Sequence, residues 1–367
     1  MTLLEYFAKI PDFRRDQGKR FGLAQLLTII TLGVMSGYYG YRELRTFMKA
    51  NELELKEILN LTWAKMPSHV TIRTIMQEVE AKEMITQFNA WCVGNQEPLA
   101  KAGIALDGKC LGSTVKQVHQ TEQDFVQVVS AFVHQRQQVL GVTSFQSSKQ
   151  GEGQAVRDLL KKLQLKDAIF TLDALHCQKK TLTLINQQGN HYVVQLKNNC
   201  AKLMAQAQSI ISQQAPLDCY HSREKQKGRL EERMVRVFAC PVTLPQWRSA
   251  QIKTLIVVDR RTQRQEDITH KTHFYLSSLT DHSAQVFAKL IRGHWSIENN
   301  LHWVKDVIQN EDQATLRQAN AAQNLSIFKN IALNTFRQHG YSSLKHAIIS
   351  FSNKIPQLFN LIHPLRT

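Results

Sequence analysis

The amino-acid sequence predicts an α/β core that carries a β-rich insertion and is preceded by a helical N-terminal region. Three observations support this: apolar residues at helical spacing before residue 95, alternating strand and helix patterns over residues 104–196, and short β-branched runs after residue 198. The chain has 367 residues, 43% of them hydrophobic, so it can bury a sizeable core and is not a disordered chain.

The N-terminal region is predicted to be helical over residues 1–95. Residues 21–41 contain no charged side chain and are long enough to cross a bilayer, at about 20 residues. Gln25, Thr28 and Thr31 interrupt this stretch, and glycines weaken its second half. We therefore favour a buried helix of a helical domain, with a membrane helix as the alternative. A second helix is predicted to start after Pro67-Ser68.

The core is predicted to follow the order β-β-β-α-β-α-β. The strands are residues 104–107, 125–133, 139–145, 168–173 and 192–196, and the helices are residues 155–163 and 176–186. Residues 198–278 form the β-rich insertion, with strands at 233–238, 253–258 and 273–276, and helices follow from Ser283 and over residues 324–336. Residues 96–98 mark a boundary, so the expected domains are 1–95, 96–330 and 331–367.

The charge distribution predicts a polyanionic partner. The net charge is +16; residues 1–100 carry 12 basic and 11 acidic side chains, which leaves +15 for the remainder. Nucleic acid is the favoured partner, although a basic protein can also simply avoid self-association. The six cysteines include no C-x-x-C pair, which argues against a zinc ribbon or a disulfide scaffold and favours a reducing, cytoplasmic compartment.

Two carboxylates, Asp107 and Asp173, each end an apolar run that is predicted to be a strand. A charge is costly there unless it has a partner, and two such aspartates side by side would repel one another. A divalent cation would relieve the conflict, and oxygen ligands suit Mg²⁺ or Mn²⁺. Each aspartate could instead cap a turn or a helix.

A third carboxylate, Glu298, lies in a polar stripe. On an α-helix His294, Glu298, His302 and Lys305 fall at i, i+4, i+8 and i+11, within about 80° of arc. This layout is typical of a helix that packs on a core with one edge in an active site. Other interpretations remain: a surface pair of Lys305 with Glu298, or a zinc site at His294 and His302, whose eight-residue spacing is unusual.

Three blocks of this sequence resemble bacterial insertion-sequence DDE transposases of the ISAs-one type, which include the H-repeat-associated proteins. The blocks are Ala105-Leu106-Asp107-Gly108-Lys109, Thr171-Leu172-Asp173-Ala174-Leu175-His176, and the segment from His294 through Glu298 to Val304. Further matches spread over nearly the whole chain, and their order and spacing together are specific.

The resemblance implies an RNase H-like fold with the β-rich insertion before the helix that bears the glutamate. Asp107, Asp173 and Glu298 would be catalytic and would ligate two Mg²⁺ (or Mn²⁺) ions about 3.5–4 Å apart. Related transposases carry Tyr, Arg, Glu and Lys at fixed spacing around the glutamate. Here Glu298 and Lys305 fill the Glu and Lys positions, whereas Ile291 and His294 stand at the Tyr and Arg positions.

The expected partner is double-stranded DNA, both the terminal inverted repeats of the element and the target. Phosphate contacts are expected from the basic excess, with Lys197, Arg229, Arg233, His294 and Lys305 as the candidates. Residues 223–236 are basic enough to contact DNA, or to form a solvated charged surface. Trp295 could stack on a flipped base or pack in the core.

The sequence thus predicts a transposase that cuts DNA at the ends of its element and joins them to a target. By analogy it would act as a homo-oligomer on DNA, in the cytoplasm at the nucleoid and without a membrane. The alternatives are a catalytically silent DNA-binding protein derived from a transposase, and a structure-specific nuclease of the same fold.

Overall fold

A computed structural model describes residues 1–94, 99–115, 124–226, 228–241, 244–280, 283–352 and 354–363. The predicted boundary at residues 96–98 lies outside these residues. The chain divides into two compact units. Unit 1 comprises Met1–Glu97, Gly108–Ala155 and Glu298–Thr367, and unit 2 comprises Pro98–Asp107 and Val156–Ile297.

The N-terminal part of unit 1 is helical, as the sequence predicts. Its helices are α1 (Leu3–Phe7), α2 (Leu23–Met35), α3 (Tyr41–Ala50), α4 (Glu52–Ile58), α5 (His69–Glu78) and α6 (Ala81–Gly94), with a short turn η1 (Asp16–Gly18). Ser68 caps α5, because its hydroxyl accepts a hydrogen bond from the amide of Thr71 at 3.2 Å.

The apolar stretch predicted as a buried helix is α2, and its residues from Leu26 to Met35 are buried. Within the described part of the chain, no helix combines the length and apolarity needed to cross a membrane.

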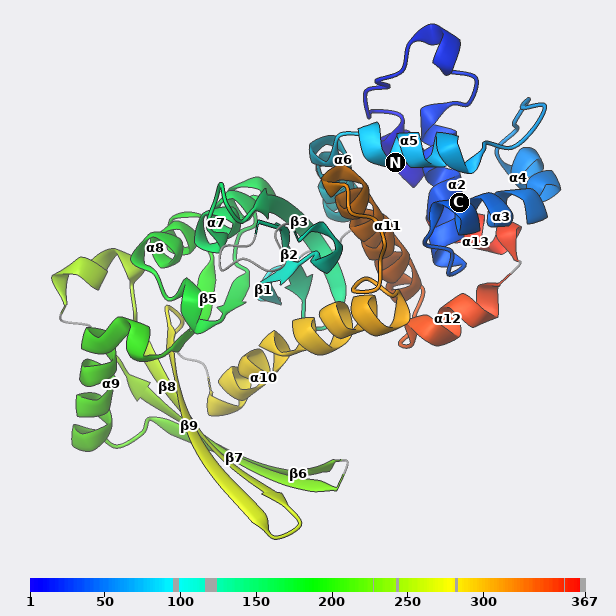
Figure 1. The fold of residues 1–367 in the computed structure, drawn as a ribbon. Coiled ribbons are helices and arrows are strands. Elements are labelled where there is room, and N and C mark those ends of the chain that lie inside the picture. The colour runs from blue at the N-terminus through cyan, green and yellow to red at the C-terminus, as the bar shows by residue number, and fades with distance from the viewer. Residues whose placement is uncertain are drawn as a thin grey trace. The chain divides into compact units, whose positions relative to one another are not determined.

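Helix α11 (Ala319–Gln338) is the centre of unit 1 and packs against α2, α5 and α6 (Figure 1). Two buried asparagines join it to its neighbours. Asn324 donates to the carbonyls of Met76 and Val79 at 3.0 and 2.8 Å, and Asn334 exchanges hydrogen bonds with the backbone of Val139 at 2.7 and 2.8 Å. Helices α12 (Leu344–Phe351) and α13 (Ile355–Ile362) follow.

The sheet has nine strands in the order β3-β2-β1-β4-β5-β9-β8-β7-β6. The first five strands along the chain are β1 (Gly103–Cys110), β2 (Val126–Val133), β3 (Gln138–Gln146), β4 (Ile169–Leu172) and β5 (His191–Leu196). β2 and β3 pair antiparallel, whereas β1 pairs parallel with β4 and β4 parallel with β5. The order of strands and helices along the chain is the predicted one, with helices α7 (Glu152–Leu163) and α8 (Lys179–Gln187) as the connections before β4 and β5.

The insertion of unit 2 differs in part from the sequence prediction. It begins with a helix that was not predicted, α9 (Ala201–Gln213), whose Leu203, Ala207 and Ile210 are buried at helical spacing. Four antiparallel strands follow: β6 (Asp218–Gln226), β7 (Arg229–Ala239), β8 (Thr254–Arg264) and β9 (Asp267–Ser277). These strands are longer than the short apolar runs suggested, because they continue through charged residues whose backbone still pairs. Figure 1 shows them as a long ribbon.

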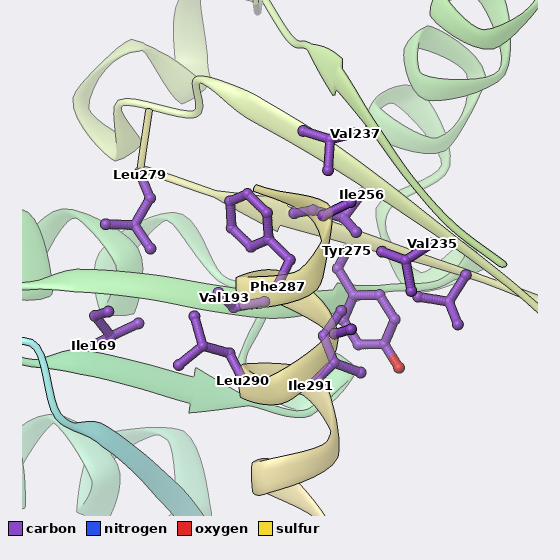
Figure 2. Close-up of a cluster of buried hydrophobic side chains, with 13 residues drawn as sticks. Ile169, Val193, Val235, Val237, Ile256, Tyr275, Leu279, Phe287, Leu290 and Ile291 are labelled. Atoms are coloured by element: carbon purple, nitrogen blue, oxygen red, sulfur yellow. The ribbon is translucent and has the colours of Figure 1, made fainter. Parts of the chain in front are cut away.

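Helix α10 (Ala284–His294) packs on the insertion and on the core strands of unit 2. Its Phe287, Leu290 and Ile291 join Val193 of β5 and Ile256 of β8 in one buried cluster (Figure 2). The cluster holds the last residues of α10 in a fixed register on the sheet, immediately before Glu298 in the sequence.

Candidate active site

Asp107 and Asp173 occupy equivalent positions on two neighbouring parallel strands of unit 2. The register pairs Ala105 of β1 with Thr171 of β4, and each aspartate comes two residues later. Neighbouring strands lie about 4.8 Å apart, and residues two apart along a strand share a face. The register therefore places the two predicted aspartates on neighbouring strands, at matching positions.

Asp173 also caps a turn, which was the alternative interpretation of a single aspartate. Its Oδ1 accepts a hydrogen bond from the Leu175 amide at 3.0 Å, at the start of the turn η3 (Ala174–His176). The side chain of Asp173 stays 46% exposed, so the cap leaves the carboxylate accessible. Capping and metal binding are therefore compatible at this position.

An open cavity of about 650 Å³ lies beside Asp173 in unit 2. Lys197, exposed at the end of β5, lines this cavity together with Asn198 and Asn199. The side-chain amide of Asn199 donates to the carbonyl of Ala174 at 2.7 Å and so supports the turn after Asp173. A predicted DNA-contacting lysine thus lines the same cavity as a predicted catalytic aspartate.

His294 is placed differently from the prediction that it contacts DNA. Its Nδ1 lies 3.2 Å from the hydroxyl of Thr171 on β4. Burial lowers the pKa of His294 to about 4, against the opposing attraction of Asp173 and the contact with Thr171. The contact with Thr171 joins the end of α10 to β4, and the predicted contact of His294 with DNA stays a prediction.

Glu298 opens a π-helical segment of unit 1, η6 (Glu298–His302), which is followed by a second, η7 (Val304–Ile308). Its carboxylate lies 3.0 Å from Nδ1 of His302, and its side chain is 60% exposed whereas that of His302 is buried. The hydrogen bond from His302 lowers the pKa of Glu298, with Lys109 adding to the effect. Glu298 is therefore an ionised, accessible carboxylate.

The polar stripe expected on an α-helical face is not a continuous exposed surface. The i→i+5 bonding of the π-helical turns changes the spacing that the sequence argument assumed. Glu298 faces solvent, but Lys305 points into the interior of unit 1 and is 3% exposed. Such π-helical segments are frequent at functional sites.

Lys305 belongs to a buried charge cluster rather than to an exposed DNA-contacting surface. Its Nζ donates to the hydroxyl of Ser326 at 2.6 Å and lies 3.1 Å from the buried carboxylate of Glu311. Lys329, also buried, lies over the ring of Tyr39, and the side chain of Gln309 donates to the carbonyl of Lys329 at 3.1 Å. The predicted phosphate contact at Lys305 does not fit this burial, because the ammonium is enclosed by protein.

Sequence reasoning missed two further charged groups of unit 1. The Nζ of Lys109 lies 2.6 Å from the carboxylate of Asp306 and 3.4 Å from that of Asp312. These two ion pairs join β1 to the segment after Glu298. The carboxylate of Glu152 lies against Gly108, where an added Cβ would come within 2.7 Å of it. Gly108, directly after Asp107, was the sequence signal for this contact, since only a residue without a Cβ lets the Glu152 carboxylate approach the backbone so closely.

Arg229 and Arg233 of β7 gather around a carboxylate of the insertion. Glu231 is 6% exposed and contacts Arg233, with Arg229 at 3.0 Å and Arg260 at 3.7 Å. Arg233 is itself largely buried. Lys227, which belongs to the basic stretch of residues 223–236, lies outside the described residues.

The order of strands and helices along the chain and the strand pairing define the class: a mixed α/β fold with an RNase H-like core that carries an insertion. The chain belongs to the transposase DDE domain family, whose model matches residues 100–335, and the DDE_Tnp_1-associated model matches residues 4–92. A transposase acts on DNA, so DNA is the substrate class.

Related proteins match most of this chain. It is 29% identical over 347 residues to the "H repeat-associated putative transposase YhhI" of Escherichia coli strain K12, across 90% of this chain and 89% of that protein. It is 29% identical to "Putative transposase YncI" of E. coli O157:H7, across 92% of this chain and 87% of that protein. It is also 25% identical, across 75% and 94%, to a protein of Xanthobacter autotrophicus named for its place in the dhlA 3′ region.

Proposed function

We propose that this protein is an active transposase that cuts DNA at the ends of its own insertion sequence and transfers the strand to a target. The observation that carries the proposal is the equivalent placement of Asp107 and Asp173 on β1 and β4. Two aspartates at matching positions of neighbouring strands can supply oxygen ligands to the same cation, which gives that arrangement a function.

Asp107, Asp173 and Glu298 would hold the divalent cations, Mg²⁺ or Mn²⁺. Their donor set fits, because three carboxylates are hard oxygen ligands and the lowered pKa of Glu298 keeps it ionised. Bound divalent ions would activate the attacking hydroxyl or water and stabilise the leaving oxygen.

The remaining residues would position these carboxylates. The His294 contact with Thr171 fixes the end of α10, and Glu298 follows His294 by only four residues. His302 orients the Glu298 carboxylate through their hydrogen bond. Lys197, beside Asp173, would hold a DNA phosphate in the open cavity.

The predicted domains of residues 1–95, 96–330 and 331–367 fit this proposal as an end-binding region, a catalytic region and a tail. A transposase that joins two ends would act as a homo-oligomer, since each copy would hold one end.

The deciding experiment uses purified protein and a duplex that carries the flanking end of its own gene. Strand cleavage is followed with Mg²⁺, with EDTA, and with Glu298→Ala in place of the wild type. We expect cleavage at the element boundary that needs both the metal and Glu298, followed by joined products when target DNA is added. DNA binding without cleavage would instead indicate a silent DNA-binding protein, and nicks without joining would indicate a nuclease.

A further inference from the structure

Two cysteines of unit 2 meet beside the cavity that contains Asp173. Cys177 directly follows the turn η3, and Cys200 ends a second short turn, η4 (Asn198–Cys200), which follows β5. The two turns are neighbours because β4 and β5 pair in parallel, so both strands end on the same side of the sheet. The Sγ of Cys200 lies 3.3 Å from the carbonyl oxygen of Cys177. Two cysteines that are distant in the sequence are therefore in contact.

Cys200 is the more reactive thiol of this pair. It is the N-cap residue of α9, and the positive end of a helix dipole favours a thiolate at that position. A hydrogen bond from the thiol of Cys177 lowers the pKa of Cys200 to about 7, against the opposing effect of burial. Because Cys200 is only half-buried, a small oxidant in solution can reach its ionised sulfur.

Cys177 has the properties of a resolving partner for Cys200. It is 2% exposed, and its contact with Cys200 together with burial raises its pKa, so it stays protonated. An oxidant therefore reaches Cys200 first, and the thiol of Cys177 meets the oxidised sulfur from inside the protein. A low-pKa, accessible cysteine next to a second cysteine is the usual arrangement of a redox-sensitive site.

The turns that carry the two cysteines form part of the wall of the Asp173 cavity. Ala174 and Leu175 of η3 line this cavity, and so do Asn198 and Asn199 of η4. The side chain of Asn199 already joins the turns through its hydrogen bond to the carbonyl of Ala174 at 2.7 Å. A disulfide holds two Cβ atoms about 3.5–4.5 Å apart in a fixed geometry. Forming one here would therefore constrain both turns and change the wall of the cavity.

We propose that Cys177 and Cys200 are a site of reversible oxidation, at which a peroxide converts the two thiols into a disulfide that slows the reaction at Asp173. Only the effect on the reaction rests on the proposed function. The oxidation itself needs a peroxide and the two cysteines alone.

The oxidation proceeds in two steps. The Cys200 thiolate attacks one oxygen of hydrogen peroxide, the O–O bond breaks, and the leaving hydroxide takes up a proton to give water. The Cys177 sulfur then attacks the sulfenic acid on Cys200, and the S–O bond breaks. The proton of Cys177 leaves with the hydroxyl group as a second water. The two thiols together lose two electrons, which the peroxide gains.

The first test identifies the cysteines that pair. The purified protein is treated with hydrogen peroxide, its free thiols are blocked, and its tryptic peptides are weighed by mass spectrometry. Lys179 and Lys197 lie between the two cysteines, so a disulfide joins two separate peptides. We expect a joined pair that contains Cys177 and Cys200 and that dithiothreitol separates. Oxidation that instead begins at Cys219, which is exposed on β6, would overturn the proposal.

Single substitutions separate the roles of the two thiols. Cys177→Ser removes the thiol that resolves the sulfenic acid, so dimedone, which labels sulfenic acids, should label Cys200 at least about 10-fold more than in wild type. Cys177→Ala repeats this measurement without a buried hydroxyl. Cys219→Ser is the matched control and should form the disulfide as wild type does. Equal labelling of Cys200 in wild type and in both Cys177 variants would overturn the proposal.

The last test measures the consequence for the reaction. Mg²⁺-dependent cleavage of the end duplex is compared for reduced protein, oxidised protein, and oxidised protein treated with dithiothreitol. Displacement of the turn after Asp173 should slow cleavage by at least about 10-fold, and dithiothreitol should restore the rate. Cys177→Ser should not form the disulfide, whereas Cys219→Ser should respond as wild type does. A disulfide-linked protein that cleaves at the full rate would overturn the effect on the reaction.

Failure of the proposed function is distinguishable from failure of this inference. A reduced protein that does not cleave its end duplex would contradict the proposed function. The peptide and dimedone measurements need no cleavage, so they then decide by themselves whether Cys177 and Cys200 are an oxidation site.

Discussion

The two regions that carry the predicted catalytic carboxylates are built in different ways. Asp107 lies within β1 and Asp173 directly follows β4, and backbone hydrogen bonds of a parallel ladder join these two strands through buried residues. The π-helical segment from Glu298 is instead held by charge pairs, the buried pair of Lys305 with Glu311 and the partly exposed pair of Lys109 with Asp306. The comparison teaches that substitutions near the aspartates should affect chemistry, whereas substitutions near Glu298 should affect folding as well.

The largest expected effect is the loss of cleavage in Asp107→Asn and Asp173→Asn. Each should lower the cleavage rate by at least about 10³-fold, which equals about 4 kcal/mol of barrier, because an amide is a poor ligand for a divalent cation. Thermal melting in EDTA should change little, since asparagine keeps the shape of the side chain and its oxygen at residue 173 can still accept the hydrogen bond from the Leu175 amide.

The exposed Asp267 at the start of β9 provides the control, and Asp267→Asn should retain full cleavage. A large loss of melting temperature in the Asp107 or Asp173 variants would show that these two side chains matter for folding, which contradicts the comparison.

The next largest effect is expected for Lys305→Met. Removing this ammonium leaves the Glu311 carboxylate buried without its main partner, which should lower the free energy of unfolding by about 3–5 kcal/mol. The measurement is urea denaturation. The double variant Lys305→Met/Glu311→Leu should recover most of the loss, because neither charge is then buried alone.

Lys56→Met is the comparison variant, because Lys56 pairs with Glu52 at the i,i+4 spacing of α4. It should cost less than about 1 kcal/mol. Similar costs at Lys305 and Lys56 would mean that the buried cluster does not hold the Glu298 segment.

A smaller effect is expected for Thr171→Val on β4. The change keeps the shape of a buried side chain but removes the hydroxyl that contacts His294, so it should cost about 1–2 kcal/mol. Urea denaturation measures the cost, and Thr46→Val, at an exposed site of α3, is the control. No cost at Thr171 would contradict the role of His294 as the anchor of α10.

The smallest effect concerns pH. Burial lowers the pKa of Lys329 to about 8 despite the attraction of Glu311, whereas an unfolded lysine has a pKa near 10.5. Between these values the unfolded chain binds more protons, so this residue makes the folded state more stable as the pH rises. From pH 8 to about 9.5, wild type should gain stability relative to Lys329→Met by at most about 1.4 kcal/mol per pH unit.

This difference is read from urea denaturation of the two proteins at each pH. Parallel pH curves would mean that Lys329 titrates normally, and the buried-charge description of the Glu298 segment would then be incorrect.

The sequence by itself determined the order of strands and helices along the core, the helical N-terminal region and the position of Asp173 directly after a strand, whereas β1 continues past Asp107 to Cys110. It could do so because buried strands need continuous apolar runs, and a charge at the end of such a run stands out. It left α9 and β6 unrecognised, because polar side chains hide the periodicity of elements that are only half buried.

Only the tertiary structure decided the roles of the basic and histidine side chains. His294, Lys305 and Arg233 look alike in sequence as candidate phosphate contacts. In the structure His294 contacts Thr171 of β4, Lys305 is buried beside Glu311, and Arg233 lines a cavity together with other basic residues. Sequence spacing predicts which face of an α-helix a side chain lies on, but the π-helical turns after Ile297 alter the number of residues per turn and so change that face. Whether a cation meets solvent or a buried carboxylate depends on residues far away in the chain, which no short sequence pattern contains.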